Sequence, residues 1–265
     1  MECLNMIKSL KINLKRNIGT VVIIVEGAVY EFEIMKQIFK NVLHYEYIEK
    51  RRTKSKFKEY KEFVMKGNEN SRVVVINHSE SNIKNIKENC EYTNELYKML
   101  YLDYGIDIKN VPVYIVWDRD RFSNDYSITK NLLKELGNAQ ENINCDMNGI
   151  LLLSYPSVEA FVIDNFDSSI HKLKQNNIKE YIKESGLLIK NINRYTLLKA
   201  VVKMHNNLKK LGITNYNLVN FSPTSLAALE KEEKYYAENK CYMLLSFISI
   251  ILIDLNIIAE QWFVY

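Results

Sequence analysis

Four short runs of apolar residues recur in the first part of the chain, and polar stretches separate them. The runs consist largely of Val, Ile and Leu and show no alternation of polar with apolar positions, a pattern typical of strands buried on both faces of a sheet. They occupy residues 20–25, 72–76, 111–117 and 149–154. We therefore predict four buried β-strands.

Apolar residues at helical spacing follow each predicted strand. The spacing predicts helices over residues 29–42, 83–102 and 127–136, and a further helix that opens near Ser157 and carries Glu159. Short strands that alternate with helices indicate an α/β fold with a parallel sheet flanked by helices.

The pattern changes after residue 166, where helical spacing predominates and no convincing strand is predicted. We predict an α/β domain over residues 1–166 and a helical C-terminal subdomain over residues 167–265. The apolar stretch 241–258 approaches the length of a membrane span. Because Asp254 and Asn256 interrupt it, we interpret it as a buried helix and expect no membrane partner.

Composition narrows the choice of cellular location and partner. The net charge of +4 and the pI near 8.6 permit a polyanionic partner without requiring one. The four cysteines are scattered and form no C-x-x-C pair, which argues against structural zinc and fits a reducing compartment. The N-terminal residues 1–17 lack an unbroken apolar run of the signal-peptide kind, so we predict a cytoplasmic protein.

Acidic residues follow three of the four predicted strands. Glu26 comes after the first, Asp118 and Asp120 after the third, and Glu159 shortly after the fourth. In an open parallel sheet, ligands bind outside the carboxyl ends of the strands. Clustered carboxylates repel one another and favour a hard cation, so we predict a Mg²⁺ or Mn²⁺ site. Each acid taken alone could instead be a helix N-cap or a solvated loop residue.

Two of these acidic segments resemble a known family. Val-Ile-Ile-Val-Glu-Gly at residues 22–27 and Val-Trp-Asp-Arg-Asp at residues 116–120 are similar to the Toprim domain, which topoisomerases, bacterial primases, small RNA-maturation nucleases and OLD-type nucleases share. The resemblance implies that Glu26 acts as an acid/base or metal ligand and that Asp118 and Asp120 hold Mg²⁺. It further implies a ligand role for Glu159, as in Toprim proteins of the OLD and phage-defence type.

The chain departs from the Toprim pattern in two places. Many family members place a second acid or a Ser/Thr about four residues after the Glu, where this chain has Tyr30 followed by Glu31. Glu31 could substitute for that acid or could be an exposed helix residue. The chain also lacks the motif G-x-x-x-x-G-K-[ST], so any ATPase partner of the OLD kind would be a separate chain.

Basic residues suggest where a nucleic acid would bind. Residues 50–58 (KRRTKSKFK) include Arg51, Arg52 and Lys54, which could contact phosphates. Arg119, which lies between the two aspartates, could steady the phosphate at the site. The alternative for residues 50–58 is a solvated helix face. His78 follows the second predicted strand and would then lie near the same edge of the sheet.

The combined prediction is a Mg²⁺- or Mn²⁺-dependent endonuclease that cleaves DNA or RNA. The resemblance to Toprim proteins of the phage-defence type, together with the missing ATPase motif, further implies a bacterial antiphage effector. One alternative is a non-catalytic Toprim-like module that binds nucleic acid or a partner protein. Another is a Mg²⁺-dependent enzyme that acts on free nucleotides. The sequence leaves open the choice between DNA and RNA, the activating signal and the oligomeric state.

Overall fold

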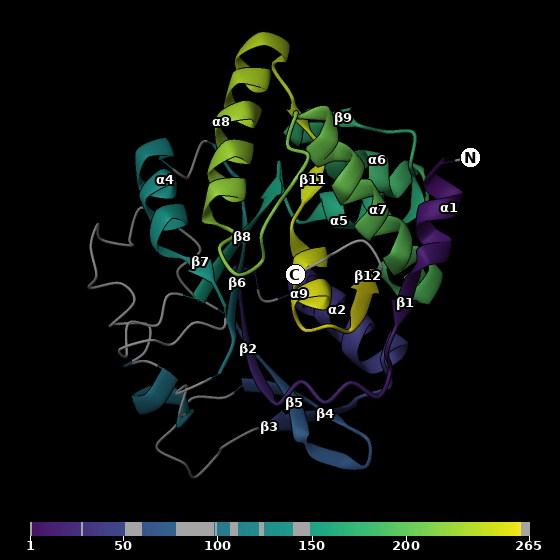
Figure 1. Cartoon of the computed structure of the whole chain (residues 1–265), viewed down its shortest axis with the longest axis vertical. Helices are drawn as coiled ribbons and strands as arrows, with labels where there is room; N and C mark the ends of the chain where they lie inside the picture. The colour runs from purple at the N-terminus through teal and green to yellow at the C-terminus, as the bar shows by residue number, and fades with distance from the viewer. Residues whose placement is uncertain are drawn as a thin grey trace.

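A mixed β-sheet between layers of helices organises the chain (Figure 1). This computed structural model describes residues 2–27, 29–50, 60–77, 98, 100–106, 111–121, 125–139 and 149–260. The predicted α/β class is confirmed at this coarse level. The basic residues Arg51, Arg52 and Lys54, as well as His78 and most of the helix predicted over residues 83–102, lie outside the described residues.

The middle of the sheet consists of the four predicted strands, all parallel. They are β2 (Thr20–Val25), β5 (Asn68–Asn77), β6 (Val113–Asp118) and β8 (Gly149–Tyr155). Their order across the sheet is β5, β2, β6, β8, so β2 and β6 are direct neighbours although almost ninety residues separate them. The side chains of β8 are buried throughout, as expected of a strand covered on both faces.

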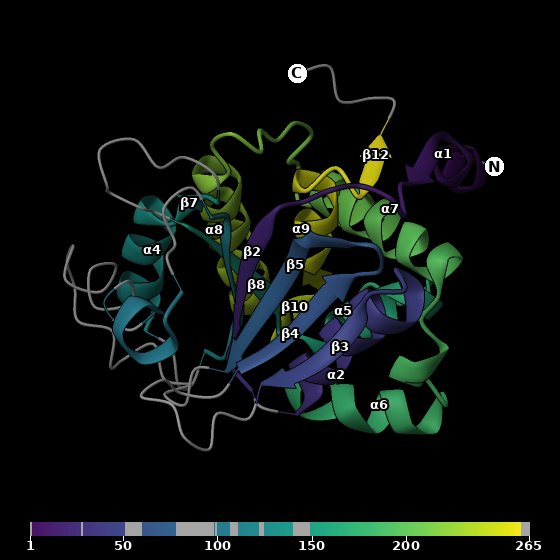
Figure 2. The same cartoon turned by 90° about the horizontal axis from the view of Figure 1, so that it is seen from below.

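Antiparallel strands complete the sheet at both ends, which corrects the prediction of a purely parallel sheet. Among the described residues they are β3 (Glu46–Lys50), β4 (Tyr60–Met65), β7 (Gly137–Asn138) and β11 (Leu245–Ser246). Strands β3 and β4 were missed because polar and charged residues occupy much of both. Such composition suits the edge of a sheet, where one face or one side meets water (Figure 2).

Helices cover both faces of the sheet. On one side lie α4 and α8, and on the other lie α2, α5, α7 and α9 (Figure 1). The described helices are α1 (Glu2–Ser9), α2 (Tyr30–Lys36) continued by a π-helix (Gln37–Val42), α4 (Tyr126–Glu135), α5 (Glu159–Phe166), α6 (Ile178–Glu184), α7 (Arg194–Lys210), α8 (Ser222–Asn239) and α9 (Ile248–Asp254), with 3₁₀ turns at Gln175–Asn177 and Ile189–Asn191.

The two longest helices, α7 and α8, begin at residues that favour the start of a helix. Asn193 caps α7, because its side chain accepts hydrogen bonds from the backbone N–H groups of Tyr195 and Thr196. The Thr196 hydroxyl in turn accepts from the Asn193 N–H, which completes a capping box. In α8, Pro223 lies in the first turn, where a missing N–H costs nothing.

The C-terminal part contains short strands, contrary to the prediction that it is helical throughout. Strand β9 (Lys172–Leu173) pairs with β10 (Tyr242–Met243), and β12 (Ile258–Glu260) pairs with β1 (Leu10–Ile12). The stretch 241–258 is therefore buried as predicted, but as two strands and α9 rather than as one helix. In the part of the chain that is described, no helix is both long and apolar enough to cross a membrane.

The sheet and its core continue across residue 166. Strand β11 pairs with β8, and the Ser246 and Ser154 hydroxyls are hydrogen-bonded at 2.8 Å. A single cluster of buried apolar side chains extends from Ile7 to Ile258. The division into two domains at residue 166 stays a prediction, while these contacts lead us to expect one cooperative unit.

Substitution of Phe247 tests that expectation. Its ring is fully buried and packs edge-on against Phe221 and Tyr155, at centroid distances of 5.1 and 6.5 Å. Phe247→Ala should lower the free energy of unfolding by about 3–5 kcal/mol, because it leaves a cavity between sheet and helices. Chemical denaturation should show one transition that shifts as a whole.

Leu188→Ala is the control, since this side chain is exposed and its removal should change the free energy of unfolding by less than about 0.5 kcal/mol. If Phe247→Ala instead produced two transitions, of which only one had moved, the residues beyond 166 would form a separate folding unit.

Candidate functional site

The carboxyl ends of three neighbouring parallel strands place the predicted acids at one edge of the sheet. Strand β2 ends at Val25, which pairs in register with Val116 of β6. Asp118, the last residue of β6, pairs in register with Ser154 of β8. Glu26 directly follows β2, so it lies beside the end of β6.

A hydrogen bond joins the first two strand ends. The backbone N–H of Asp118 donates to Oε2 of Glu26 at 3.0 Å. The carboxylate of Asp118 accepts a hydrogen bond in turn, from the backbone N–H of Val158 to Oδ1 at 2.7 Å. Val158 immediately precedes α5, so Asp118 lies at the positive end of that helix. The structure thus brings Glu26 and Asp118 into direct contact, as their positions after neighbouring strands suggested.

Glu31 belongs to the same cluster, a point that the sequence left open. It lies in the first turn of α2 and is buried. Its carboxylate occupies the space where residue 27 would carry a Cβ, and only glycine leaves that space free. Gly27 therefore lets Glu31 fold back toward the strand ends, and Glu31 is no exposed helix residue.

The environment of these carboxylates favours their protonated forms. Burial raises the pKa of Glu26 from an ordinary 4.5 to about 7, with Glu31 and Asp120 adding repulsion and the Asp118 N–H opposing the shift. Burial likewise raises the pKa of Asp118 from 3.8 to about 8, assisted by the charges of Glu26, Glu159 and Glu31. Acids so close together titrate as a coupled set, and each added proton relieves the others.

Glu159 is buried at the start of α5 and faces the same group of acids. Its charge helps to raise the pKa of Asp118 and, after burial, is the largest contribution to the raised pKa of Tyr30. Its Oε1 lies 3.7 Å from Nζ of Lys179, whose side chain is 81% exposed. An ion pair with so mobile and hydrated a partner contributes little stability.

The carboxylates do not converge on one point. Asp120 lies near enough to Glu26 to raise its pKa. Within the described residues, however, no three Asp, Glu, His or Cys side chains are grouped closely enough to hold a metal ion as they stand. Binding a cation at this edge would require the side chains to rotate away from their present backbone partners.

Arg119 points away from the acidic edge. It is only 1% exposed, and its Nη2 forms an ion pair with Oε1 of Glu233 on α8 at 2.8 Å. Neighbouring residues of an extended strand end face opposite sides, so Arg119 diverges from the aspartates that flank it. This geometry argues against the phosphate contact that we expected of Arg119.

Three parts of the acidic edge were not predicted from the sequence. They are the burial of Tyr30, the ion pair of Glu159 with Lys179, and the amide of Val158 as a hydrogen-bond donor to Asp118. Of these three, only the hydrogen bond from the Val158 amide could have been anticipated from the sequence. The turn Tyr-Pro-Ser before α5 indicated a helix start, and helix N-termini favour a carboxylate.

We compared the chain with known proteins. No protein-family model, no curated protein and no solved structure matches the chain.

The raised pKa values of Glu26 and Asp118 predict how stability depends on pH. The folded state holds these protons more tightly than the unfolded state, so the stabilisation is complete below about pH 4 and is lost as the pH rises through 7 to 8. In the presence of EDTA, the melting temperature should therefore fall over this range. In the double variant Glu26→Gln, Asp118→Asn, which keeps both hydrogen-bond acceptors, it should fall less.

Glu232, whose pKa burial raises to about 8, contributes a decline of the same sign in both proteins. The difference between the two melting curves therefore reports the titration of Glu26 and Asp118 together with the acids coupled to them. Parallel curves would show that these two carboxyls titrate normally.

Proposed function

We propose that the acidic edge binds Mg²⁺ or Mn²⁺ and that the chain is a Toprim-like nuclease, which cleaves phosphodiester bonds in DNA or RNA. One observation carries the proposal: Glu26 and Asp118, at the ends of adjacent parallel strands, are in contact and share a partly buried edge with Glu31 and Glu159. Proteins seldom bury several acids together without a function that uses them.

The donor set suits a hard divalent cation. Carboxylate oxygens are the ligands that Mg²⁺ prefers, and Asp118, Asp120 and Glu159 would supply them. A bound cation would also lower the pKa of each acid and remove the repulsion that now raises it. When bound, such a cation stabilises negative charge on a scissile phosphate.

The residues of the chain itself would position and exchange protons. In the metal-free protein the pKa of Glu26 is about 7, so this side chain exchanges a proton near neutral pH. A bound cation would lower that pKa, and Glu26 would then serve as the base. The Asp118 N–H holds its Oε2 in place. A role in antiphage defence, and an ATPase on a separate chain, are extensions of the proposal that rest on the Toprim resemblance.

The same contacts support a second candidate, a non-catalytic Toprim-like module that binds nucleic acid or a partner protein. The carboxylates of Glu26 and Asp118 already accept hydrogen bonds from backbone N–H groups. If these two carboxyls are protonated, they need no cation to offset their repulsion. In that case the acidic edge would serve mainly to join β2, β6 and α5.

Metal binding separates the two candidates. Isothermal titration with Mn²⁺ at pH 8 should give a saturable heat for the native protein, and Asp118→Asn with Asp120→Asn should abolish it while leaving the fold intact by circular dichroism. The control is Glu230→Gln with Glu238→Gln, which removes the same charge from the exposed face of α8. Cleavage of plasmid, single-stranded DNA and RNA should follow the same pattern.

Unchanged Mn²⁺ affinity in the aspartate double variant would overturn the metal site. Metal binding without cleavage of any of the three substrates would favour the binding module.

Glu159→Gln distinguishes a ligand from a residue that merely complements the dipole of α5. A ligand role predicts a melting temperature of the metal-free protein that is equal or higher, because repulsion is relieved, and metal-dependent cleavage reduced by about 10-fold or more. A dipole role predicts a loss of about 0.3–1 kcal/mol in stability with normal cleavage. Lys179→Gln is the matched control, since it breaks the ion pair but keeps the carboxylate.

A further inference from the structure

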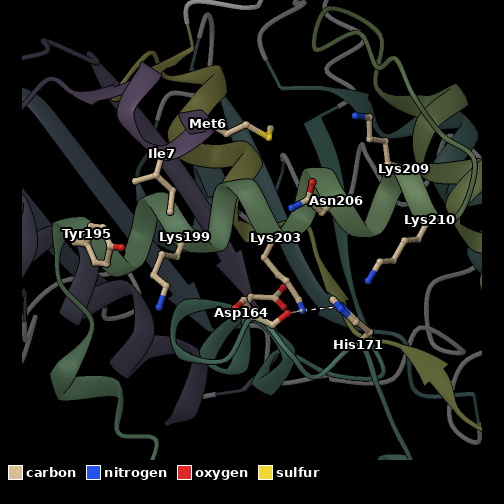
Figure 3. Close-up of a pocket in the computed structure, with 11 residues that line it drawn as sticks. Met6, Ile7, Asp164, His171, Tyr195, Lys199, Lys203, Asn206, Lys209 and Lys210 are labelled. Carbon is tan, nitrogen blue, oxygen red and sulfur yellow. Dashed lines mark hydrogen bonds between the residues drawn. The ribbon is translucent and has the colours of Figure 1, made fainter. Parts of the chain in front are cut away.

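A basic cavity lies along one face of α7, separate from the acidic edge (Figure 3). Its volume is about 730 Å³, within the usual range of small-molecule sites. Lys199, Lys203, Asn206 and Lys210 line it from α7 at spacings of four, three and four residues, which places them on the same side of the helix. In Figure 3 Lys203 and Lys210 extend toward His171, whereas Lys199 extends away from it, on the side of Tyr195.

One of these lysines, Lys203, forms its hydrogen bonds within the protein. Lys203 is 3% exposed, and its Nζ donates to the carbonyl oxygens of Ser168 and Ile170 at 2.8 and 2.7 Å. Nζ also lies 2.7 Å from Nδ1 of His171. Its charge further opposes the rise that burial causes in the pKa of Asp164. Lys203 thus holds the wall of the cavity in place.

The other two lysines leave a positive charge that no described acid balances. Among the described residues, no carboxylate lies within ion-pair distance of Lys199 or Lys210. Burial lowers the pKa of Lys210, and burial together with the charges of Lys203 and Lys210 lowers that of His171. Nδ1 of neutral His171 can accept the hydrogen bond from Lys203. The cavity therefore offers several donors and excess positive charge.

The spacing of the lysines indicates an extended anion. The Cα atoms of Lys199 and Lys210 are separated by about 16 Å along the axis of α7, at ~1.5 Å per residue. A single phosphate group reaches both ammonium groups only if both side chains extend fully toward it, whereas a chain of linked phosphates can lie between them. Beside Lys199 the cavity is lined by the ring of Tyr195, whose centroid is 5.7 Å from Nζ of Lys199, and Met6 and Ile7 supply apolar wall.

We propose that this cavity binds a small molecule with two or more phosphate groups, of the nucleoside diphosphate class, with Lys199 and Lys210 contacting the phosphates and Tyr195 contacting the nucleoside. The proposal does not depend on a nuclease activity of the acidic edge.

Calorimetry in EDTA tests the site without metal-mediated binding. ADP and pyrophosphate should bind saturably, inorganic phosphate more weakly, and adenosine weakest of the four. Lys199→Gln and Lys210→Gln should each raise the Kd for pyrophosphate by about 10-fold, the size of one lost charge-assisted hydrogen bond. Tyr195→Ala should weaken the binding of ADP and leave the Kd for pyrophosphate unchanged. Both lysines are only partly buried at most, so the variants should fold.

Two controls locate the binding. Lys183→Gln with Lys234→Gln removes two exposed lysines elsewhere and should change nothing. Glu26→Gln with Asp118→Asn should also leave ADP binding intact, so a loss there would place the ligand at the acidic edge and overturn the proposal. Absence of saturable binding of ADP and pyrophosphate at millimolar concentration would overturn it as well. The same would follow if a single-stranded RNA bound while neither small molecule did.

Discussion

The hydrogen bond from the Asp118 N–H to the Glu26 carboxylate joins the sheet to its acidic edge. It connects the ends of β2 and β6, and the hydrogen bond from Val158 to Asp118 carries the connection on to α5. These bonds return part of the free energy lost when the carboxylates leave water. The remaining cost is visible in the raised pKa values of both acids. Either a proton or a bound cation can remove this cost. A cation would make the edge a metal site, as the nuclease requires, whereas protons alone would leave it a structural connection between strands and helix.

Much of this edge could be predicted, because a strand buried on both faces appears in the sequence as a continuous run of apolar residues. Four unbroken apolar runs gave the central strands, and the rule that ligands bind at their carboxyl ends gave Glu26 and Asp118. The direct contact between the two also required β2 and β6 to be neighbours, which no local pattern specifies. Glu31 stayed ambiguous for a similar reason, since its burial depends on the missing Cβ of Gly27.

The rest of the fold was harder to predict, because its elements are short and depend on tertiary partners. Strands β3 and β4 carry many polar residues, and β10 and β11 have two residues each, too few to show a period of two. The burial of Arg119 was not predicted, because both of its sequence neighbours are aspartates. Its burial against Glu233 requires α8, which is more than one hundred residues away in the sequence. The lysines of α7 resemble an ordinary solvated face until the loop at 168–171 closes over one of them.

Helix α5 connects the two charged regions of the molecule. Its first residue, Glu159, faces the acidic edge, and Asp164, five residues later, lines the basic cavity. At ~1.5 Å per residue, the two Cα atoms are separated by only about 7–8 Å along the helix axis. The Asp118 carboxylate lies at the positive end of this helix, and the Lys203 ammonium lies beside its last turn, where a cation is favoured. The charges of Asp118 and Lys203 thus complement the dipole of α5 at its two ends. Because α5 is only two turns long and packs against α7 and β11, the acidic edge and the basic cavity lie at the two ends of one packed element.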